Sequence, residues 1–209
     1  MHESSMPTLP RTVMWRRIID DLSVEQAALS HVPEGYEIIG VILVAEAGTP
    51  LRIDYRLRCS MDWRTREVEL EQVLGADRRS MRLSADGMGA WRVNGVEAPE
   101  LAGCIDVDLE FSPSTNALPI NRLRLKVGER AEISAAWVRF PALHVIASHQ
   151  AYHRLDQAQF GFQSLASGFE AVLDVDHTGL PVLYSGIWQR IADGASPQAP
   201  GASAARSAP

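Results

Sequence analysis

The chain has 209 residues, 46% of them hydrophobic, which is enough to bury one substantial core in a single domain. Its formal net charge of −6 argues against nucleic acid as a main partner, because neutralising phosphates requires clustered Lys and Arg. Two cysteines are too few for a disulfide framework, so we expect Cys59 and Cys104 to be reduced and buried.

Residues 1–15 lack the charged and then apolar pattern of a secretory signal, and we expect residues 1–11 to be flexible. The longest apolar run, residues 38–45, is interrupted by Gly40 and is far too short to span a bilayer. We therefore expect a cytoplasmic protein that does not insert stably into a membrane.

Residues 23–31 fit two interpretations. Ser23 and Gln26 have the spacing of a capping box that opens a helix, but Pro33 and Gly35 would end such a helix early. The same residues fit a strand equally well, and the pattern does not decide between the two.

Elsewhere apolar and polar residues alternate with a period of two, which is typical of strands with one buried face. The alternation is clearest in residues 51–59, 67–71, 80–84 and 122–127. Turn signals separate these runs, and Asp86-Gly87 and Asn94-Gly95 are strong hairpin signals. The sequence therefore predicts roughly a dozen strands and few short helices.

The segment GCIDVDLEFSPSTNALPINRL, residues 103–123, combines an acidic alternation with a Pro-bounded polar turn. As a strand, residues 103–111 would place three acidic side chains on one face, and the strand after the turn would carry three basic ones. These side chains are Asp106, Asp108 and Glu110, and then Arg122, Arg124 and Lys126. We interpret the two faces as a solvated, charge-matched pair.

Three other interpretations of this segment stay open. Asp106 and Asp108 fit a site for a hard cation, although not an EF-hand-type loop. They also fit a general acid/base pair separated by the i to i+2 rise of a strand, roughly 7 Å. Alternatively, Asn116 with Asp106 and Arg122 would hold the polar head of an amphiphile at a cavity mouth.

His149 and His153 have the spacing of a zinc motif, but Gln150 stands where the catalytic glutamate would be. The flanking residues favour a strand, on which the two imidazoles lie roughly 13 Å apart, too far to share a metal. No nucleophile elbow, P-loop or dinucleotide fingerprint is present. We expect neither a metal site nor a cofactor.

Residues 192–209 are rich in Ala, Ser, Pro and Gly without periodicity, which predicts a disordered tail and leaves one domain at residues 12–191. An antiparallel sheet with one apolar face must hide that face. Since no long helices are available to cover it, the sheet must curl into a barrel, half-barrel or roll. A closure of a dozen strands leaves room for an apolar cavity.

Several segments resemble the bacterial putative glycolipid-binding family, over roughly residues 15–188. They are MDWRTR (61–66), DGMGAW (86–91), residues 103–123, QAYHR (150–154) and FEAVLDVDHTGLPVLYSGIW (169–188). The resemblance implies an all-β, spirally rolled or incompletely closed antiparallel barrel, a fold compared with bacterial lipoprotein carriers such as LolA and LolB.

The matching positions imply a set of site residues. They are Trp63, Arg66, Trp91, Asp106, Asp108, Asn116, Pro119, Arg122, Gln150 and Tyr152. All except Pro119 are expected to contact a ligand. The chain departs from the family pattern at Ser112, Asn121 and Pro181.

Three functions follow as hypotheses. The first is binding of a glycolipid or other small amphiphile, with acyl chains held by apolar strand faces and a polar head held by Trp, Asp, Asn and Arg side chains. The second is an enzyme, a hydrolase or isomerase, that uses Asp106 or Asp108 as acid or base. The third is a structural module that forms homo-oligomers through exposed strand edges.

Overall fold

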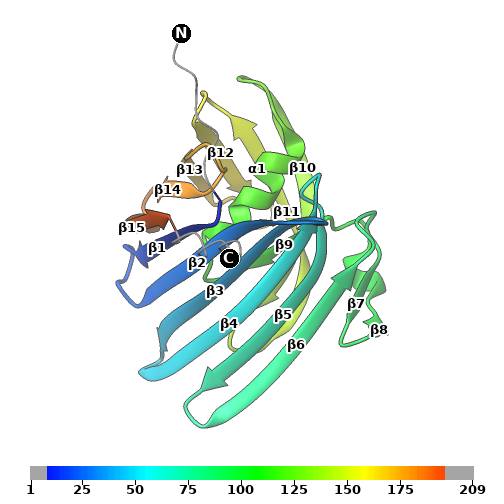
Figure 1. Ribbon diagram of the computed structural model, residues 1–209, viewed down its shortest axis with the longest axis vertical. Helices are drawn as coiled ribbons and strands as arrows, with labels where there is room; N and C mark the ends of the chain where they lie inside the picture. The colour runs from blue at the N-terminus through cyan, green and yellow to red at the C-terminus, as the bar shows by residue number, and fades with distance from the viewer. Residues whose placement is uncertain (1–8, 196–209) are drawn as a thin grey trace, which may run out of the picture.

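A computed structural model describes residues 9–195, and all strands in this part of the chain belong to one 15-stranded sheet (Figure 1). Its first eight strands are β1 (Arg11–Arg17), β2 (Ser23–Val32), β3 (Gly35–Glu46), β4 (Thr49–Ser60), β5 (Thr65–Leu74), β6 (Asp77–Ala85), β7 (Trp91–Val93) and β8 (Val96–Glu97). The others are β9 (Asp106–Leu109), β10 (Arg130–Arg139), β11 (His144–Arg154), β12 (Gln159–Ser164), β13 (Glu170–Val175), β14 (Pro181–Tyr184) and β15 (Trp188–Ala195).

The strand order shows that the sheet is rolled. From β1 the chain meanders outward to β8, crosses to β9 at the opposite edge of the sheet, and meanders back to β15, which pairs with β1. A flat sheet of this size would separate its edges by roughly 65 Å. The crossover from Glu97 to Asp106, which includes the short 3-10 helix η1 (Pro99–Leu101), reaches at most about 32 Å.

Backbone and side-chain hydrogen bonds bring the β9 edge against the other half of the roll. The amide of Thr65 donates to the Ile105 carbonyl at 3.3 Å, and the amide of Val107 donates to the Thr65 hydroxyl at 3.0 Å. The Trp91 indole donates to the Cys104 carbonyl at 2.7 Å. Since no ladder joins the two edge strands of the described sheet, the barrel is incompletely closed, as the resemblance implies.

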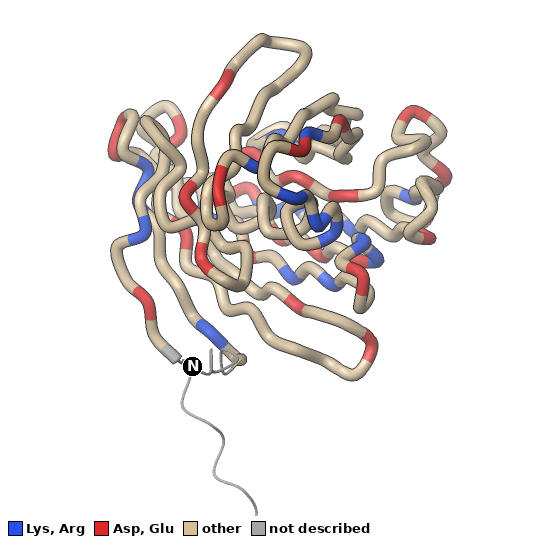
Figure 2. The backbone as a smooth tube through the Cα atoms, turned by 90° about the horizontal axis from the view of Figure 1, so that it is seen from above, with Lys and Arg blue, Asp and Glu red and all other residues tan. Residues whose placement is uncertain are grey.

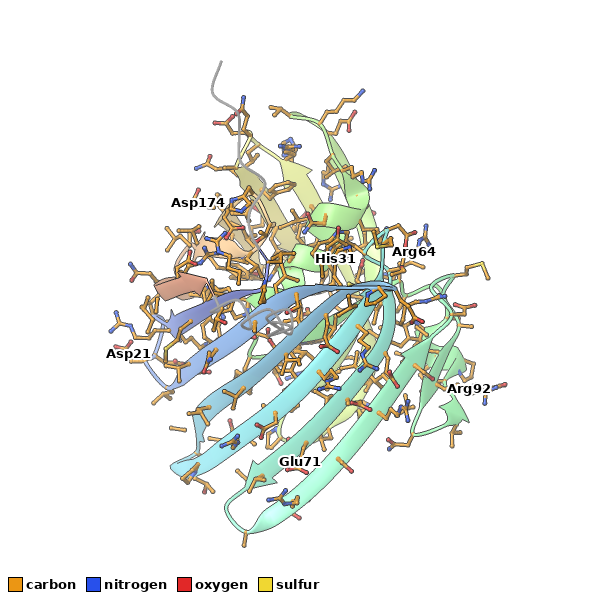
Figure 3. The ribbon with its side chains drawn as sticks, in the orientation of Figure 1. Asp21, His31, Arg64, Glu71, Arg92 and Asp174 are labelled. Atoms are coloured by element: carbon orange, nitrogen blue, oxygen red, sulfur yellow. The ribbon has the colours of Figure 1, made fainter. Side chains whose placement is uncertain are left out.

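The predicted alternation holds along the long strands. In β4, Leu51, Ile53 and Leu57 face the core, whereas the arginines between them face outward. The outward charges pair across strands, as Arg58 does with Glu37 at 2.9 Å. Figure 2 shows both signs of charge spread along the sheet, and Figure 3 shows outward side chains such as Glu71 and Arg92. Burial on one face and pairing on the other fix the register.

The interior of the roll holds a helix where the sequence predicts a strand. The turn after β9 forms the 3-10 helix η2 (Ser114–Asn116) and continues as α1 (Ala117–Leu123), which buries Ala117, Leu118 and Ile120. Pro119 lies in the first turn, where its missing N–H has no intrahelical partner. Arg124 ends the helix in a left-handed conformation, with φ of 48°. The predicted pairing of residues 104–110 with 122–126 is therefore wrong, and β9 instead pairs in parallel with β10.

The structure also places the ambiguous segment at residues 23–31, the paired histidines and the two cysteines. Residues 23–31 lie in strand β2, and His149 and His153 lie on strand β11. Cys59 and Cys104 are buried and free. Strands extend to Arg11 and Ala195, beyond the expected domain limits, while most of the expected flexible N-terminus and tail lies outside the described residues. Within residues 9–195, no helix is long and apolar enough to cross a membrane.

Candidate functional site

A cavity of about 370 Å³ lies within the half of the roll built by β9–β15 and the end of β1; we call it the β9–β15 pocket. Three of the predicted site residues line it: Asp108, Asn116 and Gln150. They come from β9, η2 and β11, which the parallel β9–β10 pairing and the β10–β11 hairpin hold together.

Asp108 is the central polar group of this pocket. Its carboxylate accepts a hydrogen bond from Gln150 Nε2 at 2.7 Å and one from Thr115 Oγ1 at 3.2 Å. Burial raises the pKa of Asp108 to about 6, more than these two donors lower it, and the charge of Glu110 raises it further. The side chain therefore carries a negative charge at neutral pH in a mostly apolar setting.

Behind Asp108, two polar pairs fix the pocket wall. Asp106 is only 1% exposed and forms a bidentate ion pair with Arg122, with N–O distances of 2.9 and 2.6 Å. The Tyr152 hydroxyl donates to Asn116 Oδ1 at 2.9 Å. The interpretation of the acidic face as solvated is therefore wrong, because α1 brings Arg122 inside the roll and against Asp106.

A buried carboxylate that the sequence reasoning missed supports the loop at residues 112–116. Glu25, fully buried on β2, accepts hydrogen bonds from the hydroxyls of Tyr55, Ser112 (2.7 Å) and Ser114 (2.9 Å). Burial raises the pKa of Glu25 to about 7. Because Ser112 also lines the pocket, this cluster attaches the pocket wall to β2 and β4.

Aromatic and aliphatic side chains form the rest of the pocket lining. The aromatic ones are Trp137, Phe162, Phe169, Tyr184 and Trp188. The Phe162 ring lies 6.2 Å from the Phe169 ring and 5.9 Å from the Tyr184 ring, between centroids. Ile19 and Phe169 are 61% and 42% exposed, whereas Gln150 is 4% exposed. The pocket thus has Gln150 among its buried residues, while exposed residues of both kinds, Ile19, Phe169 and Ser167, lie at its mouth.

The remaining predicted site residues lie elsewhere. Trp63 stacks on Tyr36 with ring centroids 4.1 Å apart, and Trp91 is buried beside Cys104. Arg66 donates to the Asp86 carbonyl in the β6–β7 turn. The structure does not bring these three residues to the β9–β15 pocket, and their contacts are with other parts of the fold.

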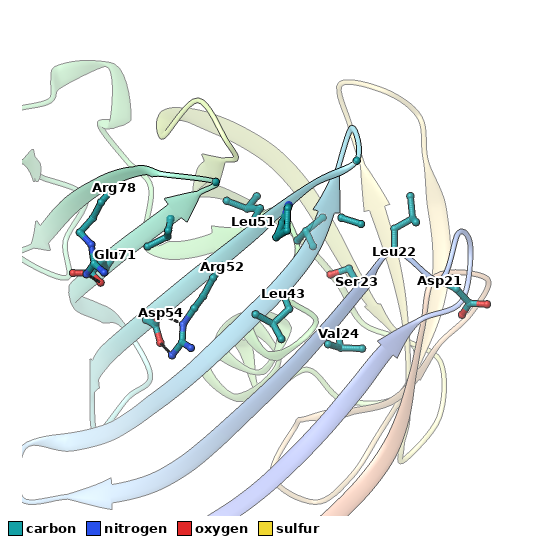
Figure 4. Close-up of a pocket in the computed structure, with 16 residues that line it drawn as sticks. Asp21, Leu22, Ser23, Val24, Leu43, Leu51, Arg52, Asp54, Glu71 and Arg78 are labelled. Carbon is teal, nitrogen blue, oxygen red and sulfur yellow. Dashed lines mark hydrogen bonds and ion pairs between the residues drawn. The ribbon is translucent and has the colours of Figure 1, made fainter.

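A second cavity, of about 880 Å³, lies along the ends of β2–β6 (Figure 4). It contains none of the predicted site residues. Its charged side chains are already in ion pairs: Arg52 binds Asp54 at 2.6 Å, Arg78 binds Glu71, and Asp21 lies 3.6 Å from Arg16, outside the lining. Although it is larger, its buried polar side chain is the neutral Ser23, 2% exposed, and its carboxylates are all in ion pairs, unlike Asp108. Within residues 9–195, no group of three or more His, Cys, Asp or Glu side chains could hold a metal ion.

Of the residues that the sequence reasoning missed, Glu25 has a signal in the sequence. Glu25 alternates in phase with Ser23, Ala27 and Leu29, which all face inward on β2. Reading residues 23–32 as a strand would have placed a carboxylate in the core. The pocket aromatics come from four strands and a loop, so only the tertiary fold brings them together.

Comparison with known proteins identifies the family. The chain matches the family described as "Putative glycolipid-binding" over residues 12–190. A crystal structure of a DUF1089 family protein from Pseudomonas aeruginosa is similar, with a TM-score of 0.69 and 33% sequence identity over 91% of this chain and 97% of that one. No curated protein matches the sequence. By sequence and by fold, this chain belongs to the family described as "Putative glycolipid-binding".

Proposed function

We propose that the β9–β15 pocket binds a small amphiphile of the glycolipid type. The single observation that carries this proposal is the convergence, in one cavity, of buried polar groups and five aromatic rings. Pockets of this kind, largely apolar with a few placed polar groups, are typical of small-molecule sites. Asp108, Asn116 and Gln150 would receive the hydroxyl groups of a polar head.

The pocket volume favours a head group and the first part of a chain over a whole lipid, because it lies at the lower end of ligand pockets, roughly 300–1,000 Å³. The apolar chain would then leave past Ile19 and Phe169. The strand faces expected to hold acyl chains are instead packed in the core, where Ile38 and Ile53 are fully buried.

Native mass spectrometry of the purified protein, followed by titration with n-octyl β-glucoside, tests the proposal. Ser148 and Ala147 are neighbours on β11 that face opposite sides of the sheet, and only Ser148 lines the pocket. Ser148→Trp should fill the pocket and lower affinity at least tenfold, whereas Ala147→Trp should leave affinity unchanged. Equal effects of the two variants, or no binding by the parent protein, would contradict the proposal.

One observation favours a second candidate, a glycoside hydrolase. Asp108 and Glu110 both line the pocket, and the raised pKa of Asp108 suits a general acid. Glu110 is held by Arg139 at 2.8 Å and by the Phe140 amide, which leaves it less available as a second catalytic carboxylate. Turnover of 4-nitrophenyl glycosides that is lost in Asp108→Asn would favour the enzyme. Binding of these glycosides without turnover would favour the amphiphile-binding protein.

A further inference from the structure

Of the charged side chains that line the β9–β15 pocket, some have an ion-pair partner and one does not. Three charged side chains line it: Arg17, Asp108 and Glu110. Arg17 pairs with Asp20 at 2.9 Å, and Glu110 pairs with Arg139 at 2.8 Å. Among the described residues, no Lys, Arg or His nitrogen lies within ion-pair distance of Asp108. The pocket therefore carries one uncompensated negative charge.

Neighbouring groups do not supply the missing cation. Gln150 and Thr115, the two donors to Asp108, are neutral. Arg122, on the adjacent helix, is fully engaged in its bidentate pair with Asp106. A carboxylate that is partly removed from water and has only neutral donors is destabilised, and a ligand cation placed beside it would relieve that penalty.

The pocket walls also favour a cation. Aromatic faces attract ammonium groups through the ring quadrupole, and the effect grows when the pair is removed from water. Phe162 and Tyr184 line the same cavity as Asp108. Burial raises the pKa of the Tyr184 hydroxyl, and the negative charge of Asp108 raises it further. An ammonium group in the pocket would thus meet aromatic rings and an unpaired carboxylate together.

We propose that the head group recognised by this pocket carries an ammonium group, as in an amino sugar, and that this group pairs with Asp108. The proposal rests on the proposed amphiphile-binding function and narrows its substrate class. An anionic head, such as a uronic acid or a phosphate, would be repelled by Asp108, and the one cation in the lining, Arg17, is already paired with Asp20. Anionic heads are therefore the class that the pocket disfavours.

Three amphiphiles with the same chain test this: n-octyl β-glucoside, the n-octyl glycoside of glucosamine and the n-octyl glycoside of glucuronic acid. Calorimetry at pH 7.5, below their critical micelle concentrations, measures affinity. The glucosamine glycoside should bind at least tenfold more tightly than the glucoside, and the glucuronic acid glycoside more weakly than either. In Asp108→Asn the preference for the amine should fall to about one.

Glu170→Gln is the matched control, because it removes one negative charge beside Phe169 but outside the pocket lining. It should retain the preference for the amine. Equal or tighter binding of the glucoside by the parent protein would overturn the ammonium proposal while leaving amphiphile binding intact. Binding of none of the three glycosides would overturn both, and persistence of the preference in Asp108→Asn would show that another group recognises the amine.

Discussion

Asp106 and Arg122 form a buried ion pair in which each charge is stable only while its partner is present. The carboxylate is almost completely buried and both its oxygens accept from Arg122. Removing one member of such a pair leaves a buried charge without compensation, which costs far more than losing an exposed pair. The pair also joins α1 to β9, so it fixes the position of the helix that precedes β10.

Arg122→Met should therefore lower the free energy of unfolding by about 3–5 kcal/mol, and adding Asp106→Asn should restore much of that loss. Urea denaturation of the two variants measures the difference. Arg92→Met, which breaks the exposed pair with Glu97, is the control and should cost less than about 1 kcal/mol. Equal losses for Arg92→Met and Arg122→Met would show that burial of the Asp106 pair is energetically unimportant.

Glu25 should make stability depend on pH. Because burial raises its pKa from 4.5 to about 7 in the folded protein, its stabilising contribution is complete below pH 4.5 and is lost as pH rises to about 7. Over that range the loss amounts to about 3 kcal/mol. Glu25→Gln should flatten the curve of unfolding free energy between pH 5 and 8, leaving a smaller slope of the same sign from Asp108. Identical slopes for the two proteins would contradict this assignment.

At the scale of elements, strands β3 and β4 show how a glycine positions the Glu25 cluster. Gly40 pairs with Tyr55 across these strands, and a Cβ at Gly40 would lie 2.5 Å from the Tyr55 ring. The Tyr55 ring therefore lies across the bare backbone of Gly40, and this placement brings its hydroxyl to Glu25.

Gly40→Ala should displace the Tyr55 ring, weaken its bond to Glu25 and lower the free energy of unfolding by about 1–3 kcal/mol. Gly161→Ala is the matched control, since Gly161 also lies within a strand but its nearest neighbours to a new Cβ are 3.8 Å away. Thermal unfolding compares the two variants. If Gly161→Ala is as destabilising as Gly40→Ala, steric contact with Tyr55 is not the cause.

The elements also show where sequence patterns are sufficient and where they fail. Strand β4 is predictable because each residue meets water or the core in strict alternation. Helix α1 is not, because its side chains lie inside the roll and its short length leaves no helical period to detect. The same burial converts Asp106 from an expected surface residue into a core residue. The family resemblance predicts Trp63 and Trp91 at the site, but their burial elsewhere depends on the path of the whole sheet.

For the whole molecule, the two halves of the roll differ: one is packed on its inner face, and the other contains the pocket. The β2–β6 half forms a broad curved sheet whose inner face is packed, and α1 lies between it and the β10–β13 half (Figure 1). The pocket occurs on the side where β9, β11, β12 and β14 meet the end of β1. The rolled topology is what brings residues from both ends of the chain to one cavity, which no local pattern reveals.

The five tryptophans allow the most direct test of binding at this cavity. In a titration of ¹⁵N-labelled protein with n-octyl β-glucoside below its critical micelle concentration, NMR resolves each indole N–H, and Trp→Phe variants assign them. Trp137 and Trp188 line the pocket, whereas Trp63 and Trp91 are packed elsewhere. Saturable shifts at Trp137 and Trp188, with Trp63 and Trp91 unmoved, are the expected result. Shifts confined to Trp63 or Trp91, or no shifts at any indole, would contradict the assignment of the pocket.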